Sequence, residues 1–165
     1  MGAFGPPWHA ETGMLPLHKQ ANPHWRVCAR RRYRMTVATT GQKTILVIED
    51  DPWTRTITTA LLAGEGFAVV EAKNGEEGLK RAREHAPDAV LLDLALPTKS
   101  GLEVLRELKR DISTMGIPVI VVSAYGALMN EQDAQQAVGV IQKPFDYDDL
   151  VGQVEKATVR TLAIA

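Results

Sequence analysis

Cysteine is almost missing from the sequence, since Cys28 is the only one in 165 residues. An internal disulfide is therefore excluded, which fits a reducing compartment, and we expect a cytoplasmic protein. Long hydrophobic runs are missing as well, because no apolar stretch approaches the ~18 residues that a membrane span requires. The N-terminus has no apolar segment followed by a cleavage site, so we expect neither a signal peptide nor contact with a membrane.

Most of the chain carries no excess of positive charge. The net charge is −1 at pH 7, but residues 1–40 carry six Lys and Arg against one Glu, whereas residues 41–165 carry 13 against 19 Asp and Glu. A mildly acidic folded part argues against nucleic acid as the main partner. Four arginines cluster within residues 30–34, where an arm that touches nucleic acid or anionic lipid is one interpretation.

Apolar residues do not recur at a regular spacing within residues 1–40, and prolines interrupt this stretch. We predict a disordered basic tail here, or upstream sequence included by a mis-assigned start, because Met35 stands shortly before the first predicted strand. His18, His24 and Cys28 match no zinc-binding spacing and lack a fourth ligand, so no zinc site is predicted.

From residue 43 onward, short apolar runs alternate with amphipathic segments. The alternation predicts strands at 44–48, 67–72, 89–93, 117–122 and 140–142, and helices at 52–64, 76–85, 101–111, 126–138 and from 146 onward. Asp51 is predicted to cap the first of these helices, whose core side would carry Ile57, Leu61 and Leu62. This pattern predicts an α/β fold with a parallel sheet and helices on both faces, so functional groups should gather at the carboxyl ends of the strands.

Polar residues follow four of the five predicted strands, namely Glu49, Asp50, Asp51, Asp93, Ser123 and Lys143. Singly, each has a simpler interpretation as a helix cap, a turn residue or a solvated lysine. Together, the carboxylates would repel one another, by about 4 kcal/mol for two charges 4 Å apart at an effective dielectric near 20. A lysine neutralises part of this charge, and an oxygen-rich pocket without His or Cys suits Mg²⁺ rather than zinc. Such groups suit phosphoryl transfer with a carboxylate nucleophile.

Four stretches resemble the receiver domain of two-component response regulators: Ile45–Asp51, Leu91–Pro97 with Gly101, Val121–Ala124 and Lys143–Phe145. The resemblance covers residues 43–160 and implies a flavodoxin-like (βα)5 fold with sheet order 2-1-3-4-5. It also implies roles: Asp93 as the phosphoacceptor, Glu49 and Asp50 as the Mg²⁺-binding acidic pair, the Ala95 carbonyl as a further metal ligand, Ser123 as the switch hydroxyl and Lys143 as the phosphate-binding lysine.

The sequence departs from the family at two places. Val140 stands where the family often has a Tyr or Phe that moves inward on activation, so we expect the signal to pass chiefly through Ser123 and residues 124–129. Ala95 and Tyr125 occupy the positions that tune loss of the phosphoryl group. Neither is a good water-orienting acid or amide, and we therefore expect slow self-dephosphorylation.

The resemblance implies a single-domain response regulator that accepts a phosphoryl group from a histidine kinase or a histidine phosphotransfer protein and then changes its affinity for a protein partner. We expect no enzymatic activity beyond this transfer and autodephosphorylation, because an aspartyl-phosphate phosphatase would need an Asp where Ala95 stands. The chain ends soon after Lys143, so we expect no DNA-binding output domain. The alternative is a receiver-like binding module that works without phosphorylation.

Overall fold

The computed structural model describes residues 41–124 and 129–160 of the chain. In these residues strands and helices alternate, in the order β1 (Thr44–Ile48), α1 (Pro52–Gly64), β2 (Ala68–Ala72), α2 (Gly75–His85), β3 (Ala89–Asp93), α3 (Gly101–Arg110), β4 (Val119–Ser123), α4 (Glu131–Gln136), β5 (Gly139–Gln142) and α5 (Tyr147–Arg160). The predicted basic tail, Tyr125 and most of the predicted start of the fourth helix lie outside the described residues. Within the described part, no helix is long and apolar enough to span a membrane.

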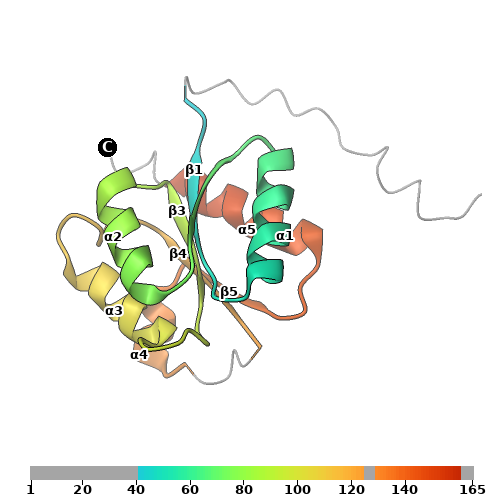
Figure 1. Ribbon diagram of the computed structural model, residues 1–165. Helices are drawn as coiled ribbons and strands as arrows, with labels where there is room; N and C mark the ends of the chain where they lie inside the picture. The colour runs from blue at the N-terminus through green and yellow to red at the C-terminus, as the bar shows by residue number, and fades with distance from the viewer. Residues whose placement is uncertain (1–40, 125–128, 161–165) are drawn as a thin grey trace, which may run out of the picture. The chain divides into compact units, whose positions relative to one another are not determined.

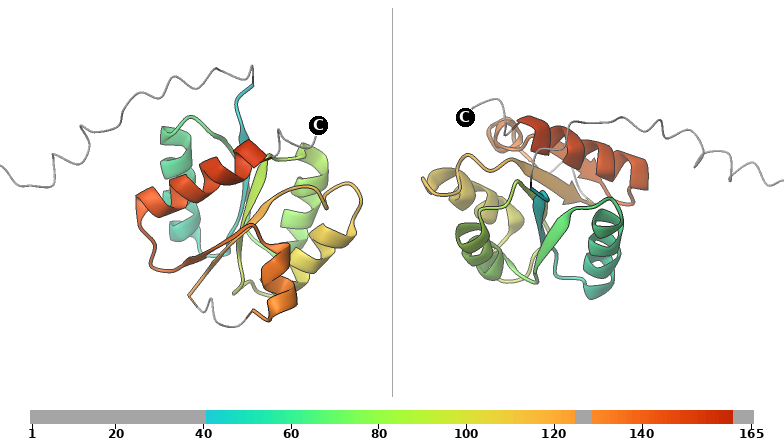
Figure 2. Two further views of the ribbon diagram at one scale, coloured as in Figure 1. Left: turned by 180° about the vertical axis from the view of Figure 1, so that it is seen from behind. Right: turned by 90° about the horizontal axis from the view of Figure 1, so that it is seen from above.

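The five strands form one parallel sheet in the order β2-β1-β3-β4-β5. This order confirms the flavodoxin-like topology that the resemblance to receiver domains implies. Helices α2 and α3 cover one face of the sheet, and α1 and α5 cover the other (Figures 1 and 2). Because connected parallel strands all run the same way, their carboxyl ends meet at one edge, where a site can form.

Two hydrophobic cores hold these layers together, one on each face of the sheet. Alternate side chains of a strand point to opposite faces, and the central strands are apolar on both. Leu46, Val90 and Val121 pack toward α2 and α3, whereas Ile45, Leu91 and Ile120 pack toward α1 and α5. Burial on both faces explains why β1, β3 and β4 appear in the sequence as continuous apolar runs.

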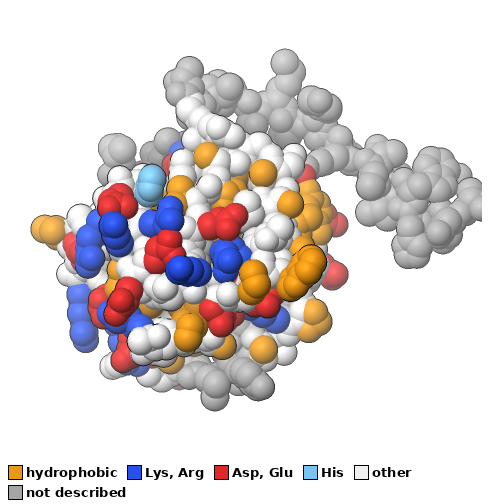
Figure 3. All heavy atoms as spheres, viewed as in Figure 1, with side chains coloured by type: hydrophobic (Ala, Val, Ile, Leu, Met, Phe, Trp, Pro, Cys, Tyr) orange, Lys and Arg blue, Asp and Glu red, His pale blue; other side chains and the backbone are white. Residues whose placement is uncertain are grey.

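The surface over α2 and α3 carries interspersed positive and negative side chains, whereas apolar side chains gather on the α1 side of the same view (Figure 3). Several of the charges are paired, as between Arg81 and Glu77 and between Arg83 and Asp111. Helix α1 instead exposes Trp53 and Ile57.

Some predicted details are wrong. Ile57 is 55% exposed, and Thr58 takes a buried position of α1 instead, whereas Leu62 is buried and Leu61 packs against the core as predicted. The helical spacing allowed either side of α1 to face the sheet, and the contacts of the folded chain decide in favour of Thr58. Strand β4 begins at Val119, after Pro118, and the described part of the fourth helix is limited to Glu131–Gln136.

The loop from β3 to α3 makes a close turn beside the carboxyl end of β3. A Cβ atom at residue 101 would lie 2.1 Å from the carbonyl oxygen of Asp93, so only glycine fits there. Thr98 adopts a positive φ of 70°, and the N–H of Lys99 donates to the carbonyl of Pro97 across it. Ser100 then begins α3 as its N-cap, in a capping box with Glu103.

Candidate functional site

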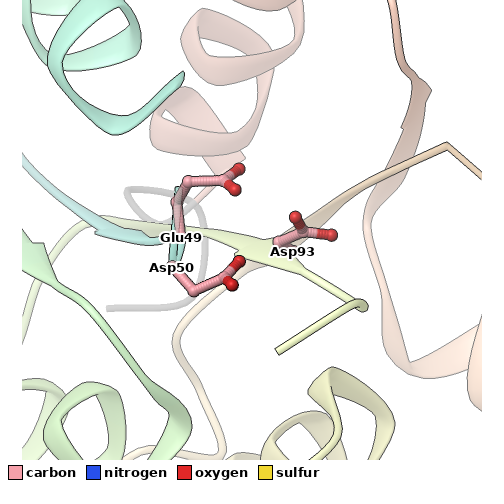
Figure 4. A group of neighbouring side chains, drawn as sticks. All are labelled: Glu49, Asp50 and Asp93. Atoms are coloured by element: carbon pink, nitrogen blue, oxygen red, sulfur yellow. The ribbon is translucent and has the colours of Figure 1, made fainter. Parts of the chain in front are cut away.

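Three carboxylates meet at the carboxyl edge of the sheet, in the residues that follow β1 and at the end of β3. Oxygen atoms of Glu49, Asp50 and Asp93 all lie within 4.8 Å of one another. Figure 4 shows the three side chains grouped around one space. Glu49 and Asp93 are each only 5% exposed, while Asp50 is exposed. Two of the charges are therefore buried, and the third faces solvent.

Lys143 links the two buried carboxylates. Its Nζ donates to Glu49 Oε2 at 2.7 Å and to Asp93 Oδ2 at 2.6 Å. The position of Lys143 is set by the sheet, because its backbone N–H donates to the carbonyl of Ser123 at 3.0 Å. Burial lowers the pKa of Lys143, but the hydrogen bonds to Asp93 and Glu49 outweigh that effect and leave the pKa raised. The lysine is therefore held as a cation between the two acids.

The pKa of Glu49 reflects how unfavourable it is to bury two carboxylates side by side. The pKa of Glu49 is raised from 4.5 to about 7, chiefly by burial; the hydrogen bond from Lys143 opposes this rise and the charge of Asp93 adds to it. One lysine thus compensates only in part for two buried carboxylates. A second cation at this position would favour the ionised form of Glu49.

The two oxygens of Asp93 have different partners. Oδ1 accepts a hydrogen bond from the backbone N–H of Ala95 at 3.0 Å, whereas Oδ2 accepts one from Lys143. Both contacts fix the orientation of the carboxylate at the end of β3. Ala95 itself is exposed on the loop, and its expected role as a carbonyl ligand stays a prediction.

Ser123 is the last residue of β4 and is buried. In the register of the sheet Val122 pairs with Asp93, so Ser123 lies one position past the acid on the neighbouring strand. Val140 pairs with Val121 on the outermost strand, β5, and is 40% exposed.

The donor set fits a hard divalent cation. Carboxylate oxygens are the ligands that Mg²⁺ prefers, and the described cluster contains neither His nor Cys. An exposed Asp50 beside two buried acids also leaves one side open to water, which Mg²⁺ retains in most protein sites. Glu49, Asp50 and Asp93 therefore suit Mg²⁺ better than zinc.

Sequence reasoning placed Asp51 correctly and missed Arg55. The carboxylate of Asp51 accepts from the N–H of Thr54 at 2.7 Å, which confirms Asp51 as the N-cap of α1. Arg55 donates to the backbone of the acidic pair. No sequence motif singled out Arg55, because an arginine near the start of a helix is normally a solvated charge.

Known proteins share this architecture. The family profile of the response regulator receiver domain matches residues 45–155. Among curated proteins, the chain is 37% identical over 94 residues to the polar-differentiation response regulator DivK of Brucella anthropi, covering 57% of this chain and 76% of DivK. It is 35% identical over 103 residues to the protein PilH of Pseudomonas aeruginosa, covering 62% of this chain and 81% of PilH.

Solved structures of response regulators are also similar to this chain. The response regulator TrrA of Thermotoga maritima, determined in complex with Mg²⁺ and BeF, has a TM-score of 0.65 and 33% identity, over 70% of this chain and 99% of that one. A response regulator receiver domain protein of Clostridium thermocellum has a TM-score of 0.69 and 30% identity, over 74% of this chain and 99% of that one.

Proposed function

The chain belongs to the response regulator receiver domain family, and we propose that it is a phosphorylatable switch of the single-domain type. Asp93 accepts a phosphoryl group from a histidine kinase or a histidine phosphotransfer protein, and the affinity for a protein partner then changes. The observation that carries this proposal is the position of Lys143 Nζ, within 2.7 Å of both Glu49 and Asp93 and beside the exposed Asp50. Similarity to DivK and PilH over most of their lengths supports the single-domain type.

Glu49, Asp50 and Asp93 are the residues that would hold Mg²⁺, with the carbonyl of Ala95 as a further ligand. When bound, this cation supplies positive charge that offsets the carboxylates and the oxygens of the transferred phosphoryl group. The mixture of two buried acids and one exposed acid supports this assignment.

Three residues of the site have separate tasks in the proposed transfer. A carboxylate oxygen of Asp93 attacks phosphorus, so a P–O bond forms while the P–N bond to the donor imidazole breaks and the imidazole nitrogen keeps the electron pair. Lys143 offsets the negative charge that gathers on the phosphoryl oxygens. The N–H of Ala95 holds the carboxylate in one orientation for the attack.

Ser123 is the proposed switch hydroxyl, which donates to the phosphoryl group once it is present. Its place one residue past the position that pairs with Asp93 supports this role. Because Val140 replaces the usual aromatic, the change passes chiefly through Ser123 and the segment that follows it. The phosphoryl group alters the partner's affinity only to the extent that the partner binds the two conformations differently.

Beyond this transfer we propose no enzymatic activity, and the proposed site of action is the cytoplasm. The proposed partners are proteins rather than DNA or a membrane. The acidic balance of residues 41–165 supports this choice.

Phosphorylation can be tested with acetyl phosphate and Mg²⁺ on a phosphate-affinity gel. The wild-type protein should shift in mobility, and Asp93→Asn should not. The matched control is Asp148→Asn, an exposed aspartate on α5, which should shift like the wild type. A shift that persists in Asp93→Asn would exclude Asp93 as the acceptor. No shift in the wild type, together with partner capture that beryllofluoride leaves unchanged, would favour the phosphorylation-independent module.

The expected slow dephosphorylation is a separate test. After removal of acetyl phosphate, the wild-type phosphoprotein should decay over minutes to hours, and Ala95→Asn should shorten its lifetime because an amide can orient the attacking water. Wild-type decay within seconds would refute this part of the proposal.

A further inference from the structure

We propose that Arg55 is a positioning residue for the cation site, because it holds the backbone that presents Glu49 and Asp50. The inference rests on the proposed function, since it concerns the Mg²⁺ site of the same acids. Arg55 lies in the first turns of α1. Its Nη1 donates to the carbonyl oxygen of Glu49 at 2.7 Å and to that of Asp50 at 3.2 Å. Its Nε donates to Glu71 Oε2 at 3.3 Å, on β2.

These contacts hold a segment that belongs to no helix or strand. Glu49 and Asp50 lie between the end of β1 and the start of α1. The N–H of Glu49 donates to the carbonyl of Ala72 on β2, at 3.1 Å. The two carbonyls of the pair then point to Arg55. The direction of both acidic side chains therefore depends on the guanidinium that fixes their backbone.

Arginine has the geometry for this arrangement. Its Nη1 donates to both carbonyls while its Nε, held in the same rigid plane, donates to Glu71, whereas a lysine has one nitrogen for all three acceptors. The Arg55 side chain is 18% exposed. The hydrogen bond to the Glu49 carbonyl is part-buried and so is partly shielded from competing water, which strengthens it, whereas those to Asp50 and Glu71 are exposed.

If Arg55 acted only through its charge, it would weaken Mg²⁺ binding rather than support it. A guanidinium close to a cation site repels the cation, so removing a purely electrostatic Arg55 should tighten Mg²⁺ binding. The carboxylate of Glu71 offsets part of that repulsion and also anchors the guanidinium of Arg55. If Arg55 instead positions the acids, its removal weakens Mg²⁺ binding. The sign of the change therefore separates the two roles.

The test is calorimetric titration of Mg²⁺ into the full chain, with urea unfolding measured in parallel to show that each variant is folded. Arg55→Ala should raise the dissociation constant about tenfold, the lower end of the loss expected when a group that supports metal ligands is removed. Arg55→Lys keeps the charge and should also raise it, by about threefold or more, because a single nitrogen that binds the two carbonyls is no longer anchored on Glu71 by a second one. Arg83→Ala, which removes a guanidinium paired with Asp111 where α2 and α3 end, should leave the dissociation constant unchanged.

A second readout separates positioning from catalysis. At saturating Mg²⁺, Arg55→Ala should accept the phosphoryl group from acetyl phosphate at the wild-type rate, and it should be slower only when Mg²⁺ is limiting. An unchanged or lower dissociation constant in Arg55→Ala would overturn the inference about Arg55 alone. If Arg55→Ala does not fold, wild-type affinity in Arg55→Lys would overturn it equally. Absence of Mg²⁺ binding by the wild type would instead refute the cation site of the proposed function.

Discussion

Replacing Glu49 by Gln should remove a pH dependence of stability that the wild-type site creates. Burial raises the pKa of Glu49 from 4.5 to about 7 in the folded protein, against the lowering effect of Lys143. Between these values the folded state binds more protons than the unfolded state, so the free energy of unfolding falls as the pH rises. The stability that Glu49 contributes is fully present below pH 4.5 and is lost as the pH rises through about 7.

The size of the effect follows from the two pKa values. The difference between 4.5 and about 7 corresponds to about 3 kcal/mol, at 1.36 kcal/mol for each tenfold change in proton affinity. Because Glu49 is only 5% exposed, solvent screening reduces this little. Gln keeps the size of the side chain and an oxygen that accepts from Lys143, but it does not titrate. Glu49→Gln and the wild type should be equally stable near pH 4.5, and at about pH 8 the variant should be more stable by up to about 3 kcal/mol.

The measurement is urea unfolding followed by circular dichroism, in a chelator, at steps from pH 4.5 to about 8. Other described carboxyl groups with shifted pKa values, such as Asp51, Glu77 and Asp111, have them lowered and therefore titrate below this range. Glu76→Gln, an exposed substitution on α2, is the matched control and should keep the wild-type dependence. Parallel curves for the wild type and Glu49→Gln would refute the reasoning. Added Mg²⁺ should stabilise the wild type more at about pH 8 than at about pH 5, since the cation binds the ionised form.

Unfolding experiments on four further single variants have expected outcomes. Thr98→Asn should raise the free energy of unfolding by about 1 kcal/mol, because Asn tolerates a positive φ that a β-branched side chain resists; an unchanged urea midpoint would argue against strain at Thr98. Gly101→Ala should lower it by about 1–3 kcal/mol or more, since the new Cβ would meet the carbonyl of Asp93. Gly152→Ala, in open space within α5, should instead be neutral or stabilising by up to about 1 kcal/mol, and equal losses in the two glycine variants would contradict the close approach at Gly101. Lys143→Met should lower stability by about 3 kcal/mol in a chelator, as expected when one member of a buried ion pair is removed, and Mg²⁺ should restore much of it; a loss that Mg²⁺ leaves unchanged would show that the cation does not replace the lysine's charge.

The sequence by itself determined the fold class and the edge of the sheet at which the polar residues meet. Continuous apolar runs at β1, β3 and β4 indicate strands buried on both faces, and amphipathic segments between them require a parallel sheet. Once the strands are parallel, the residues after them must share one edge. For that reason the alternation of strands and helices is enough to predict that Asp93 and Lys143, 50 residues apart in the chain, lie near each other.

The tertiary structure alone decided which side chains contact one another at that edge. Helical spacing could not tell whether Ile57 or Thr58 faces the sheet, because both sides of α1 carry small or apolar residues. Nothing in the pattern distinguished Arg55 from a solvated arginine, since its role depends on where the chain turns after β1. The raised pKa of Glu49 likewise depends on burial, which outweighs the lowering effect of Lys143. Apolar periodicity is a local property that reports secondary structure, whereas hydrogen bonds and burial arise from segments far apart in the chain, and only folding brings those segments together.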